Sequence, residues 1–454
     1  MFHGLPVSTV ESDLFDLVLK GGSVVLPDAT VTTDVYVRGE MIAAIGGTGK
    51  AAAELDCTGL TILPGVIDTQ VHFREPGATE SEDLESGSRA AVLGGVTGVF
   101  EMPNTRPTTS TPEALADKLA RARNRMWCDH AFYIGATVDN ADRCGELEKL
   151  AGTAGIKVFM GSSTGNLLIS EDTMLERVLR SGVRRVAVHA EDEDRLKERM
   201  NLRVAGDAAS HPVWRDDESA LRATDRVLHL ARKTGRRVHI LHVTTPQELA
   251  LISRHRDIAS CELTPQHLTL AGEDVYPRLG TLAQMNPPIR SGAHRDGLWH
   301  WLGQGMPDVI GSDHAPHSLE SKNRSYPSSP SGMPGVQTLL PLMLDHVANE
   351  RLTLRRLVDL TSAGPQRLFG LVRKGRIAVG YDADFSIVDL RASWTIEERW
   401  LASKCGWSPF VGKRLTGRPV GTVIRGKRVM WEGELLGEPA GMPLRFDATD
   451  RPAS

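Results

Sequence analysis

Short runs of apolar and alternating residues, interrupted by glycine and proline, occupy both ends of the chain. Three lie near the N-terminus: FDLVLKGGSVV (15–25), TTDVYVRGEMIAAIG (32–46) and LTILPG (60–65). Two lie near the C-terminus: DADFSIVDL (382–390) and GTVIRGKRVMWEG (421–433). Such runs are typical of β-strands joined by turns, so both ends are predicted to form β-structure.

Between these ends, strand-like runs alternate with helical segments. The strand-like runs are AGIKVFMG (154–161), VRRVAVHAED (183–192), GRRVHILHVTT (235–245), ASCELT (259–264) and PDVIGSDHAPH (307–317). The helical segments are PEALADKLARARNR (112–125), SEDTMLERVLRSG (170–182) and DESALRATDRVLHLARKTG (217–235). In the last of these, Leu221, Thr224, Val227, Leu228 and Ala231 recur at helical spacing, and Gly235 is expected to end the helix.

Strand–helix alternation of this length predicts a parallel sheet covered by helices, either an eight-fold barrel or an open doubly wound sheet. The barrel is favoured because no glycine-rich phosphate loop follows the first strand, and because ionisable residues fall at the carboxyl ends of several strands. We therefore expect an α/β fold: a (β/α)8 barrel of the TIM type over residues 63–375. A small β-sandwich domain, built from residues 1–62 and 376–454, completes it.

Composition narrows the class of protein. The formal net charge is −4, which gives no basic footprint for nucleic acid. No apolar run approaches the roughly 20 residues that span a bilayer, and the first residues, MFHGLPVSTVESDLFD, do not resemble a signal peptide. The five cysteines are scattered, without a CxxC pair, which favours free thiols in the cytoplasm.

Side chains that can bind a metal ion or carry a proton lie near the ends of the predicted strands. His72, Lys157, His189, His242 and Asp313 each end or follow a separate strand. Alternation of side chains also places Gln70, His72 and Arg74 on one face of the first strand. Taken alone, a strand-end histidine is more often structural, a lone lysine can extend to solvent and an aspartate can cap a helix. Five such groups in one order instead predict a site for zinc or a similar divalent ion.

Two residues depart from a plain ligand set. Lys157 is the only charge in an apolar strand, and burial would make its amine nucleophilic enough to add carbon dioxide. The resulting carbamate could bridge two metal ions. Gln70 stands where a metal-binding strand would often carry the first histidine of a His-x-His pair. Its amide oxygen binds metal more weakly than imidazole, so one half of the site is expected to be weak and partly occupied.

Longer motifs make the chain resemble a known family. They are PGVIDTQVHFREPG, GGVTGVFEMPNT, GIKVFMGSSTGNLL, VAVHAED, HILHVTT, MNPPIR, GSDHAPH and GPQRLFGL followed by GYDADFSIVDL. Together they are similar to the amidohydrolase superfamily and, within it, to dihydroorotases of the long bacterial type. HFREPG, MPNT, NPPIR and SDHAPH carry most of the specificity, because the metal ligands are shared with hydantoinases, allantoinases and dihydropyrimidinases.

The resemblance implies roles for individual residues. His72 would bind the more buried metal with Gln70 beside it, the Lys157 carbamate would bridge, and His189 and His242 would bind the second ion. Asp313 would bind the first metal and shuttle the proton. Arg74, Asn104 and His317, with Asn286 nearby, would hold the substrate, and the loop around Gly332 would offer backbone donors. In ELTPQHL, relatives often read His-His-Leu; Gln266 and His267 stand here and are expected to be structural.

The implied reaction is the reversible hydrolysis of (S)-dihydroorotate to N-carbamoyl-L-aspartate by metal-bound hydroxide, in pyrimidine (UMP) biosynthesis. The implied cofactors are one or two zinc or similar divalent ions per subunit. The resemblance also suggests a homodimer and allows association with aspartate transcarbamoylase.

Three alternatives differ from this interpretation. An allantoinase or hydantoinase would share the metal set but would not need Arg74, Asn104 and His317 together. A non-catalytic, metal-poor dihydroorotase-like subunit of aspartate transcarbamoylase would lack several ligands, whereas here only Gln70 departs. A nucleotide-binding α/β protein would need a phosphate loop, which is not visible.

Overall fold

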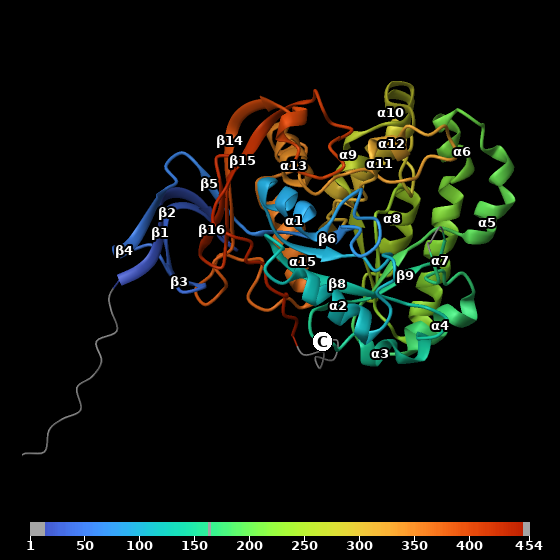
Figure 1. The fold of residues 1–454 in the computed structure, drawn as a ribbon, viewed down its shortest axis with the longest axis horizontal. Coiled ribbons are helices and arrows are strands. Elements are labelled where there is room, and N and C mark those ends of the chain that lie inside the picture. The colour runs from blue at the N-terminus through green and yellow to red at the C-terminus, as the bar shows by residue number, and fades with distance from the viewer. Residues whose placement is uncertain (1–13, 162–164, 448–454) are drawn as a thin grey trace, which may run out of the picture.

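The computed structural model describes residues 14–161 and 165–447 and contains a helix-covered barrel beside a separate β-sheet (Figure 1). The segment assessed for a signal peptide lies mostly outside the described residues, as does the Ser-Ser-Thr at 162–164. Strands from both ends of the described chain belong to one sheet, which lies on one side of the barrel (Figure 1).

Eight parallel strands form the barrel, in the order in which they occur along the chain. They are β6 (Val66–Val71), β7 (Val96–Glu101), β8 (Asp129–Gly135), β9 (Thr153–Phe159), β10 (Val186–His189), β11 (Val238–Ile240), β12 (Ala259–Leu263) and β13 (Val309–Ile310). A parallel bridge between Val71 and His314 brings the first strand beside the residues that follow the last one. Every residue of these strands is buried, which explains their continuous apolar runs.

Helices and single turns connect the strands. The α-helices are α1 (Leu84–Leu93), α2 (Pro112–Ala122), α3 (Cys144–Leu147), α4 (Asp172–Arg180), α5 (Glu193–Glu198), α6 (His211–Trp214), α7 (Asp217–Thr234), α8 (Pro246–Ser253), α9 (Pro265–Thr269), α10 (Gly272–Leu279), α11 (Gly292–Gly303), α12 (Leu319–Lys322), α13 (Leu339–Ala348), α14 (Leu354–Val358) and α15 (Gly364–Phe369). The shorter turns are η1 (Ala141–Arg143), η2 (Met200–Leu202), η3 (Ala208–Ser210), η4 (Gly280–Ala283), the π-helical η5 (Asp359–Ala363) and η6 (Glu398–Trp400).

Helix α7 illustrates how local sequence sets these bounds. The side chain of Asp216 accepts a hydrogen bond from the backbone N–H of Ser219 and so caps the first turn. Gly235 ends the helix with a φ of 70°, a left-handed conformation that glycine adopts without strain. The predicted helix and its glycine cap are confirmed.

The second body is a nine-stranded, mostly antiparallel sheet made from both ends of the described chain. Its strands are β1 (Leu14–Val25), β2 (Thr30–Arg38), β3 (Met41–Ile45), β4 (Lys50–Asp56), β5 (Thr61–Pro64), β14 (Phe385–Thr395), β15 (Arg414–Ile424), β16 (Lys427–Trp431) and β17 (Glu434–Leu435). β14 pairs with β5, which joins the late strands to the early ones. The prediction of a barrel with a small β body drawn from both ends is confirmed.

A buried ion cluster fastens the sheet to the barrel. Nζ of Lys374 lies 2.7 Å from Oδ2 of Asp129 on β8 and 2.5 Å from Oδ2 of Asp384, just before β14. Arg425 also pairs with Asp129. Buried charges are tolerated when they are paired, so this cluster holds the two bodies in a defined relation. Within the part of the chain that the structure describes, no helix is long and apolar enough to span a membrane.

Candidate active site

The predicted chemical residues gather at the carboxyl ends of the barrel strands. Gln70 and Lys157 lie within β6 and β9, and His189 is the last residue of β10. His242 and Asp313 lie beyond the ends of β11 and β13. This end of a parallel barrel is where side chains from different strands can converge on one substrate.

Strand alternation does not account for three of these positions. β6 ends at Val71, so the face predicted to include Arg74 does not continue that far. His242 and Asp313 likewise lie beyond the ends of β11 at Ile240 and β13 at Ile310. These three residues instead have positive φ values of 62°, 36° and 43°. A non-glycine residue rarely adopts this conformation, and such strain concentrates at functional sites. Backbone turns, rather than the pleat, aim these side chains.

Gln70, His72 and Asp313 form one cluster. Nε2 of Gln70 donates to Oδ1 of Asp313 over 2.9 Å, and Nε2 of His72 lies 3.2 Å from the same oxygen. Nδ1 of His72 lies 2.7 Å from Oδ1 of Asn104. Because an amide oxygen only accepts, Nδ1 carries the hydrogen and Nε2 faces Asp313 with a lone pair. Burial raises the pKa of Asp313 to about 7 and lowers that of His72 well below its usual value.

His189 and His242 form a second cluster. Nδ1 of His189 lies 3.0 Å from Nε2 of His242, and Nε2 of His189 lies 2.8 Å from Oε2 of Glu191. The carboxylate fixes the hydrogen on Nε2, so Nδ1 turns its lone pair toward His242. Burial lowers the pKa of both imidazoles, which keeps them neutral.

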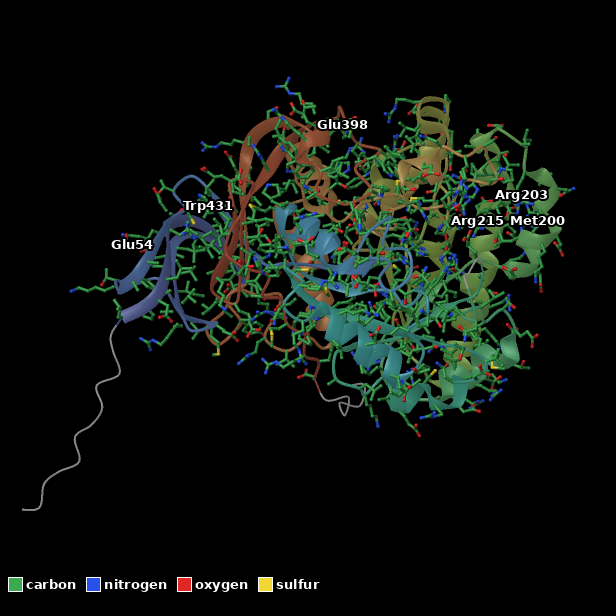
Figure 2. The ribbon with its side chains drawn as sticks, viewed as in Figure 1. Glu54, Met200, Arg203, Arg215, Glu398 and Trp431 are labelled. Carbon is green, nitrogen blue, oxygen red and sulfur yellow. The ribbon has the colours of Figure 1, made fainter. Side chains whose placement is uncertain are left out.

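Glu191 is itself held by Arg215. Nε of Arg215 donates to Oε1 of Glu191 over 3.1 Å, and both side chains are buried. Burial alone would raise the pKa of Glu191, but Arg215 and His189 hold it well below its usual value. Figure 2 labels Arg215 near Met200 and Arg203, at the end of the molecule far from Glu54 in the sheet. The chain Arg215–Glu191–His189 therefore orients one imidazole from outside the site.

Lys157 is buried without a hydrogen-bond partner among the described residues. Its side chain is 1% exposed, and Nζ lies 4.4 Å from the centroid of the Phe159 ring. Burial lowers the pKa of this amine to about 7. A buried amine of this kind is nucleophilic at neutral pH, which is the property that carbamate formation needs.

These donor atoms fit a cation. Lone pairs of His72 and Asp313 face each other, and the lone pair of His189 faces His242. Oε1 of Gln70 is buried and has no partner among the described residues. Converging acceptors repel one another unless a proton or a metal ion lies between them. In residues 14–161 and 165–447, no three His, Cys, Asp or Glu side chains form a metal-binding group. Each cluster supplies two such side chains: His72 with Asp313, and His189 with His242.

A pocket of about 420 Å³ opens beside the first cluster, with Arg74, His317 and Asn104, the partner of His72, in its wall. Nε of Arg74 donates to the carbonyl of Pro316 over 3.0 Å, and an Nη lies 3.2 Å from Nε2 of His317. The same Nε2 lies 3.0 Å from the carbonyl of Ser331. Even if Nε2 of His317 accepts from the guanidinium, these contacts use two of the five N–H donors of Arg74, so the group keeps donors for a ligand.

Two of the expected substrate contacts are used elsewhere. Oδ1 of Asn286 lies 2.9 Å from Nε2 of His211, and Asn286 does not line the pocket. The backbone N–H of Gly332 donates to the carbonyl of Gln284 over 2.9 Å. The fold thus uses the N–H of Gly332 itself to hold the loop, and backbone donors from the rest of the loop around Gly332 stay a prediction.

The loop at 325–335 is fastened by a buried lysine. Nζ of Lys322 lies within 3.0 Å of the carbonyl oxygens of Gln284, Pro330 and Gly332. Lys322 is fully buried, and Tyr326 in the loop is 1% exposed. The loop is thus a packed wall of the pocket.

Sequence reasoning missed Glu191, Arg215 and Lys322. Glu191 could have been noticed, because it follows His189 by two residues in VAVHAED, where its carboxylate can reach back to the ring. Arg215 and Lys322 lie in segments without a regular pattern and give no such signal. Gln266, expected to be structural, donates to the carbonyl of Ser312 over 2.7 Å, next to Asp313.

Comparison with known proteins places the chain in a family context. Residues 61–429 match the model of the amidohydrolase family. A dihydroorotase of Halobacterium salinarum is 37% identical over 93% of this chain and 98% of its own length. An allantoinase of Rubrobacter xylanophilus is 35% identical over 95% of this chain and 98% of its own length. The solved L-hydantoinase of Arthrobacter aurescens has a TM-score of 0.88 at 31% identity, covering 93% of this chain and 98% of its own.

Proposed function

Because the chain belongs to the amidohydrolase family, we propose that it is a dihydroorotase. The reaction would open (S)-dihydroorotate to N-carbamoyl-L-aspartate and close it in the reverse direction, as pyrimidine synthesis requires. Relatives named dihydroorotase, from Halobacterium salinarum and Methanosarcina mazei, support this choice at 37% and 33% identity.

The observation that carries the proposal is the state of Arg74. Its guanidinium lines the pocket next to His72 and, among the described residues, forms no ion pair with a carboxylate. Burial lowers the pKa of Arg74 to about 10, so the group still carries its charge at neutral pH. Dihydroorotate carries a carboxylate on its ring, which a guanidinium binds through two parallel hydrogen bonds.

The residues that would hold divalent ions follow from the two clusters. Gln70, His72 and Asp313 would hold one ion, His189 and His242 the other, and a carbamate on Lys157 would join them. Such ions, zinc in the first instance, would supply a nucleophile at neutral pH and polarise the carbonyl of the cyclic amide.

Asp313 is the proposed proton carrier. Burial raises its pKa to about 7, so the carboxyl can take and return a proton near neutral pH. In ring opening it would take a proton from the attacking water and deliver it to the leaving amide nitrogen. In ring closure the same carboxylate would take the proton from the attacking nitrogen and return it to the departing oxygen.

Gln70 makes the first half of the site the weaker one. Its amide adds a neutral oxygen in place of an imidazole, and its nitrogen is already bonded to Asp313. We therefore expect partial occupancy at His72 and Asp313 and firmer binding at His189 and His242. If neither half of the site held metal, the protein would be the metal-poor, non-catalytic subunit named among the alternatives.

Allantoinase is the second candidate, because relatives named allantoinase are as similar as the dihydroorotases, at 35% identity over 95% of the chain. Turnover of dihydroorotate, allantoin and hydantoin by the purified protein, with metal content measured on the same sample, separates these functions. Fastest turnover of dihydroorotate supports the proposal. Faster turnover of allantoin overturns it, and absence of all turnover with less than one metal per subunit supports a non-catalytic subunit.

The assembly belongs to the same proposal. A homodimer is expected, and association with aspartate transcarbamoylase is allowed. Light scattering of the purified chain, alone and mixed with that enzyme, tests both.

A further inference from the structure

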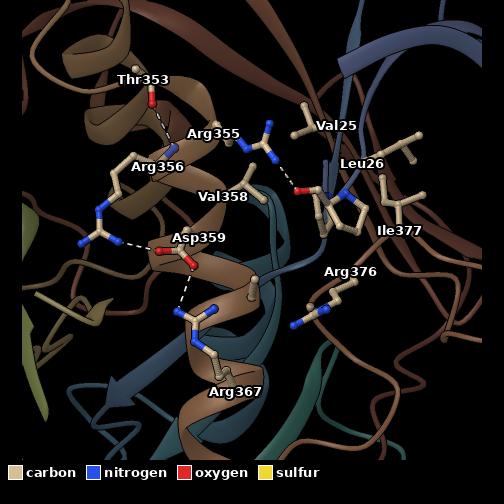
Figure 3. Close-up of a pocket in the computed structure, with 14 residues that line it drawn as sticks. Val25, Leu26, Thr353, Arg355, Arg356, Val358, Asp359, Arg367, Arg376 and Ile377 are labelled. Carbon is tan, nitrogen blue, oxygen red and sulfur yellow. Dashed lines mark hydrogen bonds and ion pairs between the residues drawn. The ribbon is translucent and has the colours of Figure 1, made fainter. Parts of the chain in front are cut away.

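We propose that a second pocket, at the junction of barrel and sheet, binds a small organic anion with an apolar body. The pocket is about 450 Å³ in volume and lies between the segment α14–η5–α15 and residues 25–27, 64 and 375–377 (Figure 3). This inference is independent of the proposed reaction, because none of the pocket's lining residues belongs to the active site.

The charge of the pocket is strongly positive. Its wall contains four arginines, Arg355, Arg356, Arg367 and Arg376, and one acid, Asp359. Arg356 and Arg367 both pair with Asp359. The pocket therefore has a local excess of three positive charges, although the formal net charge of the chain is −4. Such a local positive potential attracts anions.

Arg376 is the arginine left without a partner. Within the described part of the chain it makes no hydrogen bond or ion pair, and its Nε is buried. By contrast, Arg355 donates to the carbonyls of Pro27 and Asp28 at 2.6 and 2.8 Å. Figure 3 shows the Arg376 guanidinium directed across the pocket toward the helix that carries Asp359 and Arg367. A buried donor without an acceptor is costly, and an anion would supply the acceptor.

The remaining wall is apolar. It is formed by side chains from both bodies: Val25, Leu26, Pro27, Pro64, Val358, Ala363 and Ile377. A pocket of this volume accommodates a small ligand rather than a protein segment. The matching ligand therefore has a phosphate or carboxylate head for Arg376 and Arg367 and a compact apolar body, such as a ring, for the opposite wall.

The position of the pocket gives binding a measurable consequence. The lining residues come from the sheet, at Val25 and Pro64, and from the helices that close the barrel, at Val358 and Asp359. A ligand held by both bodies binds the native state and not the unfolded chain, so it raises the unfolding temperature. The pocket also lies near the amino end of β6, because its lining residue Pro64 comes two residues before that strand. Gln70 lies at the carboxyl end of the same strand.

The test uses phenyl phosphate and benzoate as probes, with inorganic phosphate and neutral benzyl alcohol as comparisons. Binding to the full-length protein is measured by calorimetry and by the unfolding temperature. We expect the two aromatic anions to bind and to raise the unfolding temperature, phosphate to bind more weakly, and benzyl alcohol not to bind. Whichever aromatic anion binds more tightly identifies the head group.

Three variants locate the binding. Arg376→Gln is expected to weaken binding of the aromatic anions at least about tenfold, because it removes one charge-assisted hydrogen bond. Arg391→Gln, a change of an exposed arginine on β14 outside the pocket, should leave affinity unchanged. Arg74→Met should also leave it unchanged. Absence of binding, or undiminished binding to Arg376→Gln, overturns the proposal, as does loss of binding in Arg74→Met, which would place the anion in the active site.

Discussion

The side-chain amide of Gln70 donates to Oδ1 of Asp313 over 2.9 Å, the oxygen that Nε2 of His72 also faces at 3.2 Å. An amide nitrogen thus satisfies part of a carboxylate that would otherwise be free for a cation. The opposite atom of the amide, Oε1, is buried and finds no partner in the part of the chain that the structure describes. Gln70 can therefore stabilise the site without metal or contribute a weak oxygen ligand to it.

Replacing Gln70 with histidine should strengthen the first half of the site. We expect Gln70→His to raise the metal content per subunit, because imidazole is a stronger ligand than an amide oxygen. The substitution also removes the amide N–H that donates to Asp313. Elemental analysis after dialysis against a weak chelator measures the metal content. Gln70→Ala is the control and should gain no metal; an unchanged content in Gln70→His would show that Gln70 does not limit binding.

Removing the Lys157 amine should abolish both metal retention and activity. Loss of a residue that only orients a metal ligand costs about 10- to 100-fold, so we expect loss of a ligand itself, in Lys157→Met, to lower turnover at least about 100-fold. Lys322→Met is the matched control, because Lys322 is also fully buried but bonds only carbonyl groups. It should retain metal. A native mass spectrum of the wild type should show one added carbon dioxide, and an unmodified Lys157 in active protein would exclude the carbamate.

Metal affinity should rise with pH through about 7. Burial raises the pKa of Asp313 to about 7 and lowers that of Lys157 to about 7, so both groups carry a proton below that pH. Each must lose it before binding a cation or forming a carbamate, so binding releases protons and strengthens between about pH 6 and 8. Calorimetry in buffers of different ionisation enthalpy measures the protons. No proton release at pH 6 would contradict these pKa values.

Changing Arg74 should affect anionic substrates selectively. We expect Arg74→Met to raise KM for dihydroorotate about 10- to 100-fold, the contribution of a charge-assisted hydrogen bond, and to leave KM for neutral hydantoin nearly unchanged. Arg324→Met is the control, since Arg324 lines the same pocket but is exposed. Equal effects on the charged and neutral substrates would mean that Arg74 has a structural role only.

Glu191 should tune metal affinity without touching the metal. Its carboxylate holds Nε2 of His189 at 2.8 Å, and Glu191→Gln would allow the ring to change its tautomer or orientation. We expect metal affinity to fall about 10- to 100-fold with the fold intact. Competition with a chromogenic chelator measures this, and Glu198→Gln, a change of an exposed residue on α5, is the control. Unchanged affinity would rule out the orienting role.

The sequence by itself determined the fold and the chemical inventory. Buried strands of a parallel barrel must be continuously apolar, so they stand out, and a lone lysine such as Lys157 within one is conspicuous. Helix α7 was predictable because its cap residues and periodicity are local. The family motifs around His72 and Asp313 are also continuous stretches of sequence, so they could be recognised without the structure.

Only the tertiary structure decided how those residues meet. Positive φ angles at Arg74, His242 and Asp313 carry the chain out of strand geometry, and no pattern of period two predicts them. The pairing of Glu191 with His189 and Arg215, and of Gln70 with Asp313, joins side chains that lie up to 243 residues apart. Hydrogen bonds between such distant groups depend on packing of the whole barrel, because burial removes the water that would otherwise satisfy each group separately.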